Sequence, residues 1–311
     1  MLTYDSQTID SSGAFLVGEL ERMDKTLHEP LVSVTWNRDI DLREDVTIAD
    51  EASAFTNSDF GAVGGAKATG KNWIGSKSTA IAGINLNMNK TTQPMHLWGM
   101  EAAWSIPELV RSQQLGRPVD SQKHQGLTLK HNMDVDEQVY IGDADKGCVG
   151  LVNNANITPL GLSAIWSGLT PKQILDDINA LINATWAQSG FAVCPDSLRL
   201  PPAQFGLLTN PVTDAGSESL LAYVARSCLS ANINGRPLDI KPLKWLVGRG
   251  VASANRAVAY SKNPLYVRFP MVPLQRTPLE HRGIHQVTTY FGTIGQVEFV
   301  YPETVGYADG L

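Results

Sequence analysis

The sequence predicts an α+β fold in which long strands come first, helices follow, and an α/β segment leads back to further strands. β-Branched residues are frequent over residues 31–48, apolar residues alternate with asparagine over residues 84–89, and apolar residues recur at helical spacing over residues 174–186. A spacing of two is typical of a strand and a spacing near 3.6 of a helix. The chain has 311 residues, 43% of them hydrophobic, which is enough to bury a substantial core.

Residues 31–48 are predicted to be extended, and a second strand is predicted around Ile84, Leu86 and Met88, whose alternation indicates one buried face. Between them, residues 51–80 are rich in Gly, Ala, Ser, Thr and Lys and show no hydrophobic periodicity. The simplest interpretation is a long β-hairpin with a polar tip. Ordering such an arm costs conformational entropy that no local core offsets, so the hairpin indicates contact with a partner subunit.

Two helices are predicted after the hairpin. Ser105 and Glu108 have the spacing of a capping box, and Gly116 is a suitable stop. Asp120 can cap a longer helix that runs to about Tyr140, although its apolar residues are scattered around it.

An α/β pattern begins beyond Gly142. Thr170, Pro171 and Gln173 form a strong helix start, and Gly190 ends that helix. A strand is predicted over Leu198–Leu208, and Ser217 is predicted to cap a second helix. Further predictions are an Asn234-Gly235 turn into a strand, strands at Ala257–Tyr260 and Leu265–Phe269, and a final hairpin over residues 284–301 that turns near Gly292–Gly295.

Composition excludes several classes of protein. The formal net charge is −6 and no Lys/Arg run appears, which disfavours tight or sequence-reading DNA binding. Cys148, Cys194 and Cys228 form no CxxC pair, so we expect neither a disulfide framework nor a zinc site, consistent with a reducing cytoplasm. We also expect no signal peptide and no membrane span, since no stretch of about 18 apolar residues occurs.

Catalytic and ligand-binding motifs are weak. Gly65–Asn72 has P-loop spacing, but asparagine stands where Ser or Thr would hold magnesium. Asp143–Gly147 resembles only the start of a calcium loop, so a tight turn is favoured, and His281 and His285 lie in a poor helix for a metal pair. Cys148 is interpreted as a small buried residue. We therefore expect no catalytic residue, no cofactor and no metal.

The order of the predicted elements, together with the stretches Val135–Thr158, Asn234–Gly250, Ala257–Leu274 and Val297–Gly310, resembles a known family. This family is the Hong Kong ninety-seven-type major capsid proteins of tailed bacteriophages, a fold that encapsulins share. Val135–Thr158 is similar to the end of the family's spine helix, Asn234–Gly250 to an axial-domain strand, and Ala257–Leu274 and Val297–Gly310 to its closing strands. The matching positions in the first stretch are Tyr140, Gly142, Gly150, Leu151, Asn153 and Asn154.

The resemblance implies a fold with an N-terminal arm, an extended β-hairpin loop, a long spine helix, a peripheral domain and an α/β axial domain. It places the peripheral domain at residues 1–50, 81–145 and 275–311, the extension loop at 45–84 and the axial domain at 146–274. It also implies self-assembly as pentamers and hexamers into an icosahedral shell around phage double-stranded DNA. Portal, scaffold and possible decoration proteins would be the partners, and assembly would take place in the host bacterial cytoplasm before the protein resides in the virion capsid.

Two departures from the family pattern bear on partners and contacts. The chain begins almost directly with the arm, so a separate scaffold, or none, is expected. Lys67, Lys71 and Lys77 lie in the loop where some relatives form crosslinks, but no crosslinking partner can be assigned, so solvated lysines are expected. Phe60, Lys71 and Trp73 are the predicted intersubunit contacts, because an apolar residue such as Trp73 in a polar loop tip indicates docking onto another surface.

Two alternatives remain open from the sequence. An encapsulin-type nanocompartment would have the same fold and enclose protein cargo in place of DNA. A soluble α/β enzyme would use residues 51–80 as an active-site lid, and such a lid should cover convergent polar groups.

Overall fold

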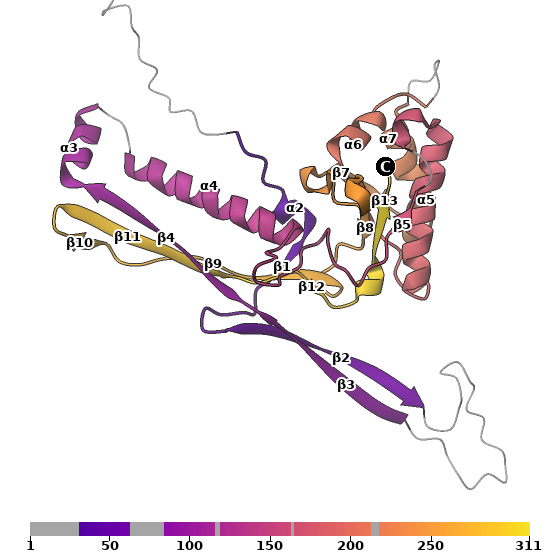
Figure 1. The fold of residues 1–311 in the computed structure, drawn as a ribbon, viewed down its shortest axis with the longest axis horizontal. Coiled ribbons are helices and arrows are strands. Elements are labelled where there is room, and N and C mark those ends of the chain that lie inside the picture. Colours follow the sequence, from indigo (N-terminus) through magenta and orange to yellow (C-terminus); the bar gives the residue numbers. More distant parts are fainter. Residues whose placement is uncertain (1–30, 63–83, 116–118, 163–164, 213–217) are drawn as a thin grey trace, which may run out of the picture.

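A computed structural model describes residues 31–62, 84–115, 119–162, 165–212 and 218–311. Figure 1 shows an α/β unit at one end, a long sheet covered by a long helix that runs away from this unit, and a two-stranded hairpin that projects separately. The predicted α+β class is therefore confirmed. Within the described ranges, no helix combines the length and the apolar character needed to cross a membrane.

The long sheet is centred on β11 (His285–Ile294), which lies between β4 (His96–Ser105) and β9 (Val267–Arg276) and runs antiparallel to both. Three short strands complete the sheet: β1 (Asp41–Arg43) and β12 (Glu298–Phe299), which pair with β9, and β10 (Glu280–Arg282), which pairs with β11.

The predicted turn near Gly292–Gly295 within a hairpin over 284–301 is wrong. β11 continues through Gly292, and the tight turn lies at Gly283, whose φ of +64° suits glycine. Gly292 serves another purpose: the register of β11 against β9 shifts here, and a Cβ on Gly292 would lie 2.9 Å from the Val272 carbonyl oxygen. The glycine permits a close strand approach at a bulge, not a chain reversal.

Helices α3 (Ile106–Leu115) and α4 (Val119–Tyr140) confirm the two predicted helices. The capping box forms as expected: the Glu108 backbone N–H donates to Ser105 Oγ at 3.2 Å, and the Ser105 N–H donates to the Glu108 carboxylate at 3.4 Å. Helix α4 is buried mainly at its C-terminal end, where Val135, Val139 and Tyr140 are fully covered. This uneven burial explains the weak amphipathic pattern of the helix.

The α/β unit contains a five-stranded sheet in the order β5-β13-β8-β6-β7. Helix α5 (Pro171–Gln188) begins at the predicted Thr170–Gln173 cap, in which the Thr170 N–H donates to Gln173 Oε1 at 2.9 Å. The strands are β5 (Leu160–Gly161), β6 (Ser197–Leu200), β7 (Asp239–Pro242), β8 (Arg256–Tyr260) and β13 (Val305–Asp309), and the remaining helices are α6 (Pro202–Leu207), α7 (Leu220–Ser227) and α8 (Leu229–Asn234).

Two predictions in this unit need correction. The strand predicted over Leu198–Leu208 ends at Leu200, because Pro201 and Pro202 stop the strand and Pro202 begins α6. The cap of α7 is Ser219, whose hydroxyl oxygen accepts the Ala222 N–H at 3.3 Å, whereas the predicted Ser217 lies outside the described residues.

The strand predicted over residues 31–48 is also mostly wrong. A short helix, α2 (Trp36–Asp39), interrupts it and leaves only the three residues of β1 in extended pairing. The cause lies on α4, where the buried carboxylate of Asp136 accepts the backbone N–H groups of Thr35 at 2.7 Å and Trp36 at 3.0 Å. These bonds satisfy the free donors at the start of α2.

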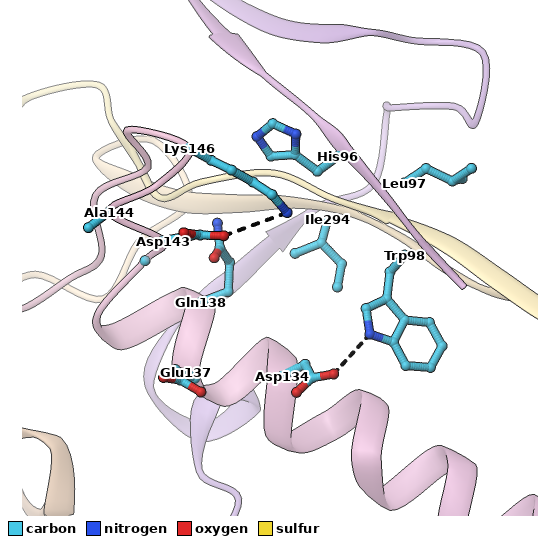
Figure 2. A pocket seen from close by; sticks show the side chains of 11 residues that line it. His96, Leu97, Trp98, Asp134, Glu137, Gln138, Asp143, Ala144, Lys146 and Ile294 are labelled. Atoms are coloured by element: carbon cyan, nitrogen blue, oxygen red, sulfur yellow. Dashed lines mark hydrogen bonds and ion pairs between the residues drawn. The ribbon is translucent and has the colours of Figure 1, made fainter. Parts of the chain in front are cut away.

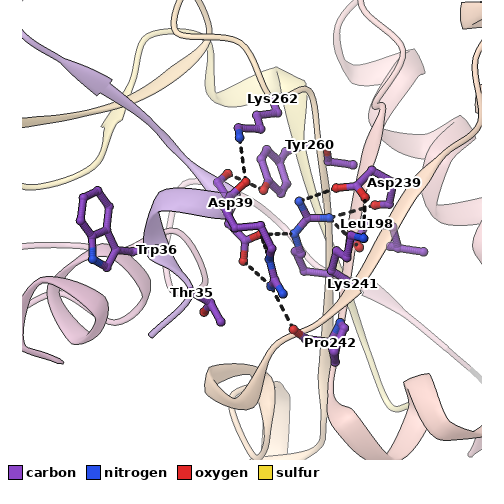
Figure 3. A network of polar contacts seen from close by, with 12 residues as sticks. Thr35, Trp36, Asp39, Leu198, Asp239, Lys241, Pro242, Tyr260 and Lys262 are labelled. Atoms are coloured by element: carbon purple, nitrogen blue, oxygen red, sulfur yellow. Dashed lines mark hydrogen bonds and ion pairs between the residues drawn. The ribbon is translucent and has the colours of Figure 1, made fainter. Parts of the chain in front are cut away.

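A buried ionic junction joins the long sheet region to the α/β unit (Figure 3). Asp39, at the end of α2, accepts hydrogen bonds from Arg199 of β6 at 2.8 Å and Arg38 at 2.7 Å, and also from the Tyr140 hydroxyl of α4. Tyr260 of β8 donates to the Asp39 backbone carbonyl at 2.6 Å. Asp39 and Arg199 are both fully buried, and each has a second charged partner: Arg38 for Asp39, and Asp239, 2.9 Å away, for Arg199. The buried charges therefore compensate one another.

Contacts within the junction shift the pKa values of two of its ionisable groups, Asp39 and Tyr140. Burial by itself would raise the pKa of Asp39, but hydrogen bonds from Arg38 and Tyr140 and the charge of Arg199 outweigh burial and hold this pKa below its usual range. Burial and the neighbouring Asp39 charge raise the pKa of Tyr140, so the phenol stays protonated and remains a donor. The junction therefore keeps its ionic form across the neutral pH range.

We expect Asp39→Asn to lower the free energy of unfolding by about 3 kcal/mol, because it leaves a buried guanidinium without full compensation. Urea denaturation of the subunit at neutral pH would measure this loss. Glu303→Gln is the matched control, since Glu303 is exposed. Equal stability of the two variants would contradict the assigned importance of the junction.

Candidate functional site

The projecting hairpin is the most distinctive surface feature. Strands β2 (Ala52–Ala62) and β3 (Ile84–Pro94) pair in antiparallel register from Ala52 opposite Pro94 to Ala62 opposite Ile84. Figure 1 shows the ribbon extending away from both the long sheet and the α/β unit. A hairpin is present as predicted, but its first strand is Ala52–Ala62, which falls in the segment predicted to be the polar tip, and not residues 31–48. The rest of the predicted tip, up to residue 80, lies outside the described residues.

The apolar face of β3 is exposed, which corrects the prediction of a buried face. Ile84, Leu86 and Met88 retain 73%, 53% and 66% of their accessible surface. Their alternation along the strand is real, so they share one side of the ribbon, but no described part of the chain covers that side. A row of large apolar side chains in water is typical of a surface that contacts another protein.

A buried carboxylate anchors the base of this hairpin. Glu298 of β12 is fully buried and accepts hydrogen bonds from Arg43 of β1 at 3.0 Å and Arg268 of β9 at 2.6 Å. The Ser53 hydroxyl of β2 donates to the same carboxylate, and Arg43 also donates to the Ala54 carbonyl at 3.0 Å. Two guanidinium groups and a hydroxyl thus fix the angle at which the hairpin leaves the sheet.

The sequence-predicted contact residues are placed only in part. Phe60 lies on β2 directly opposite Leu86, and its side chain is not described. Lys71 and Trp73 lie outside the described residues, as does the P-loop-like segment Gly65–Asn72. The structure therefore brings one of the three predicted contacts, Phe60, next to the exposed apolar row.

A shallow hollow of about 470 Å³ lies where β4 meets the end of α4 (Figure 2). Its polar groups are largely engaged with one another. Trp98 Nε1 donates to Asp134 at 2.9 Å, and Lys146 lies 3.6 Å from Asp143. The Asp143–Gly147 segment is the tight turn that the sequence favoured, since the Asp145 N–H donates to Asp143 Oδ1 at 3.0 Å.

The remaining candidates for chemistry do not converge. Cys148 is buried with its Sγ 3.5 Å from His96 Nε2, and burial raises the pKa of its thiol, which disfavours the nucleophilic thiolate. His281 and His285 lie on β10 and β11 near the Gly283 turn. No group of three His, Cys, Asp or Glu side chains in the described part of the chain could hold a metal ion.

His131 of α4 is an ionisable group that the sequence analysis passed over. It is 4% exposed, its ring meets Trp98 edge-on at 4.8 Å between centroids, and its Nε2 has no partner in the described structure. Burial lowers the pKa of His131, and the opposing charge of Asp134 offsets this only in part. His131 is therefore held neutral between α4 and the sheet.

We expect Glu298→Gln to lower the free energy of unfolding by about 3 kcal/mol and to speed hydrogen exchange in β2 and β3, because two arginines lose their shared charge. Chemical denaturation and exchange mass spectrometry would measure both effects. The exposed Glu44→Gln is the control near the same hairpin base. A drop in stability without faster exchange in the hairpin would contradict the anchoring role.

His131 predicts a pH dependence of stability. The folded-state pKa of His131 lies below the unfolded value of about 6.5, so the unfolded chain binds more protons than the folded chain as pH falls. The stability that comes from burying neutral His131 is therefore lost as pH falls from about 7. We expect His131→Phe to flatten the dependence of unfolding free energy on pH between about 7 and 5. An unchanged slope, or the same flattening in the exposed His281→Phe, would contradict this assignment.

Comparisons with known proteins agree with this geometry. The family model described as "Major capsid protein" matches residues 70–311, which is more than half of the chain. No curated protein sequence matches.

Several solved structures share the fold. The capsid of Myoviridae Phage XM1 has a TM-score of 0.76 at 17% identity, over 94% of this chain and 98% of that chain. The capsid of a native GTA particle has a TM-score of 0.64 at 12% identity, over 100% of this chain and 99% of that chain. Mycobacterium phage Bobi has a TM-score of 0.62 at 10% identity, over 97% and 98%.

The structural likeness, at these low identities, establishes a capsid fold of the Hong Kong ninety-seven type, which confirms the resemblance noted in the sequence. The family match removes the soluble-enzyme alternative, because it identifies a structural protein. The chain therefore belongs to the major capsid protein family and is a shell-forming subunit.

Proposed function

We propose that copies of this chain assemble as pentamers and hexamers into an icosahedral shell that encloses phage double-stranded DNA. The observation that carries the proposal is the exposed row of Ile84, Leu86 and Met88 on the projecting hairpin. A two-stranded ribbon is marginally stable alone, and a neighbouring copy that covers this row would remove its apolar surface from water. Repetition of that contact around a ring would build a capsomer.

The proposed domain boundaries follow the family pattern. Residues 1–50, 81–145 and 275–311 would form the peripheral domain, residues 45–84 the extension loop, and residues 146–274 the axial domain. Phe60, Lys71 and Trp73 are proposed contacts of the extension loop with neighbouring copies. The pairing of Phe60 with Leu86 in one ribbon supports its inclusion.

The proposed partners are a portal, a scaffold and, in some particles, decoration proteins. The formal net charge of −6 supports a DNA container, because a strongly basic lining would hold the genome by many phosphate contacts and hinder its release. Assembly is proposed to occur in the host bacterial cytoplasm, and the finished location is the virion capsid.

We expect the double variant Leu86→Thr/Met88→Thr to fold normally but assemble poorly. Burial of one such side chain contributes about 1.5 kcal/mol or more, so the protein concentration needed for assembly should rise at least about tenfold. Size-exclusion chromatography and electron microscopy would measure assembly, and thermal unfolding would confirm the fold. The control is Asn85→Thr/Asn87→Thr, which changes the alternate positions of the same strand.

Equal assembly of the apolar and the control variants would contradict a role for this row. The contents of shells purified from infected or expressing cells test the other half of the proposal. Packaged DNA supports a phage capsid, whereas a protein cargo without DNA would favour the encapsulin alternative.

A further inference from the structure

A second cavity, of about 580 Å³, lies at the far end of the long sheet, and we call it the distal pocket. Side chains from α3, α4, β4, β9 and β11 and from the segment after β9 line it. Those that matter to its chemistry are Trp104, Leu109, His124, Arg276, Leu279 and Tyr290. The pocket has an apolar wall and one cationic side chain, that of Arg276, and no carboxylate is among its lining residues.

Two donor groups of the distal pocket, the Arg276 guanidinium and the Trp104 indole N–H, have hydrogen-bonding capacity that no described residue uses in full. Arg276 donates through Nε to Thr288 Oγ1 at 3.3 Å and lies 5.8 Å from the centroid of the Tyr290 ring, and it has no ion pair among the described residues. Trp104 is 6% exposed, and its Nε1 is buried without a hydrogen-bond partner in the part of the chain that is described. A guanidinium that forms no ion pair, in a pocket whose lining holds no carboxylate, favours a carboxylate ligand.

Leu279, which lines the pocket, and two isoleucines at the same end of the sheet are exposed apolar residues, which indicates that the carboxylate arrives on a protein segment. Leu279, Ile106 and Ile284 are exposed by 43%, 47% and 61%. The Ile106 N–H donates to the Ile284 carbonyl at 3.0 Å, so these two residues lie side by side at this end of the sheet. Exposed apolar residues around a pocket are typical of a protein-docking surface.

The loop that joins β1 to β2 has the complementary chemistry. Residues 44–51 contain Glu44, Asp45, Asp50 and Glu51 around Ile48, which is 37% exposed. Arg43 binds Asp45, and Asp50 accepts the Thr47 N–H at 2.7 Å, so the loop is held in shape. Glu44 and Glu51 are exposed and make no ion pair with any described residue.

We propose that loop 44–51 of one copy docks into the distal pocket of a second copy, with Ile48 against the apolar wall and Glu44 or Glu51 facing Arg276. Within one copy, the loop lies at the base of the hairpin, whereas α3 lies at the far end of the long sheet (Figure 1). Leu109 of α3 lines the pocket, so the loop and the pocket are separate surfaces of the subunit. The contact is therefore head-to-tail, the type that closes into rings. It rests on the proposed shell function and specifies one contact within the shell.

A charge-swap series in the full chain tests the contact. We expect Arg276→Glu, and separately Glu44→Arg/Glu51→Arg, to slow assembly by about tenfold or more, because each places like charges at the contact. Combining all three changes should restore most of the assembly rate. Light scattering would follow assembly, thermal unfolding would check folding, and the control is Arg111→Glu, an exposed arginine of α3 outside the pocket.

The outcomes separate this contact from the shell function itself. If the wild-type chain forms shells and Arg276→Glu assembles as the control does, the docking proposal is wrong while the shell function stands. If each half of the swap slows assembly and the combination does not recover, the pocket binds a different acidic segment and loop 44–51 is wrongly assigned. Failure of the wild-type chain to assemble, with or without scaffold, would overturn the shell function and this contact together.

Discussion

The ion pair between Asp39 and Arg199 is the constraint on which the rest of the architecture depends. It lies where α2, α4 and the five-stranded sheet meet, and both side chains are fully buried. Neither charge could remain there alone, because an isolated buried ion loses several kcal/mol of hydration. The long sheet and the α/β unit are therefore held at one relative orientation. A subunit that must tile a closed surface needs this property, since a small angular error repeats in every copy.

The carboxylate of Glu298 plays the corresponding part for the hairpin. Three strands, β1, β2 and β9, converge on it through Arg43, Ser53 and Arg268. Each of the two anchors is a buried carboxylate that accepts several hydrogen bonds. The geometry of these bonds fixes the orientation of the joined elements, and their charge strengthens them. The described subunit thus consists of rigid parts with fixed angles, and its exposed apolar row lies on the part that extends farthest from the core.

Local signals predicted the helices well and the long-range features poorly. The caps at Ser105 and Thr170 were readable because the partner lies three residues away. The α2 helix could not be predicted from local sequence, because its start is stabilised by Asp136, 100 residues later. Glu298 reaches Arg43 across 255 residues, and nothing in the sequence near either residue signals the pair. Alternation on β3 correctly indicated an apolar face, but periodicity alone cannot specify which chain covers that face.

The weak packing of α4 along its first half has a mechanical consequence. Its C-terminal end is fixed by Val135, Val139 and Tyr140, whereas its N-terminal half touches the sheet through a small cluster around Leu127, Trp104 and Tyr290. A rod clamped at one end and lightly held at the other behaves as a cantilever spring. Bending of the lightly held half would disturb fewer buried contacts than bending near the clamped end. A bend imposed on the subunit along this helix should therefore fall in its N-terminal half and leave the buried junction undisturbed.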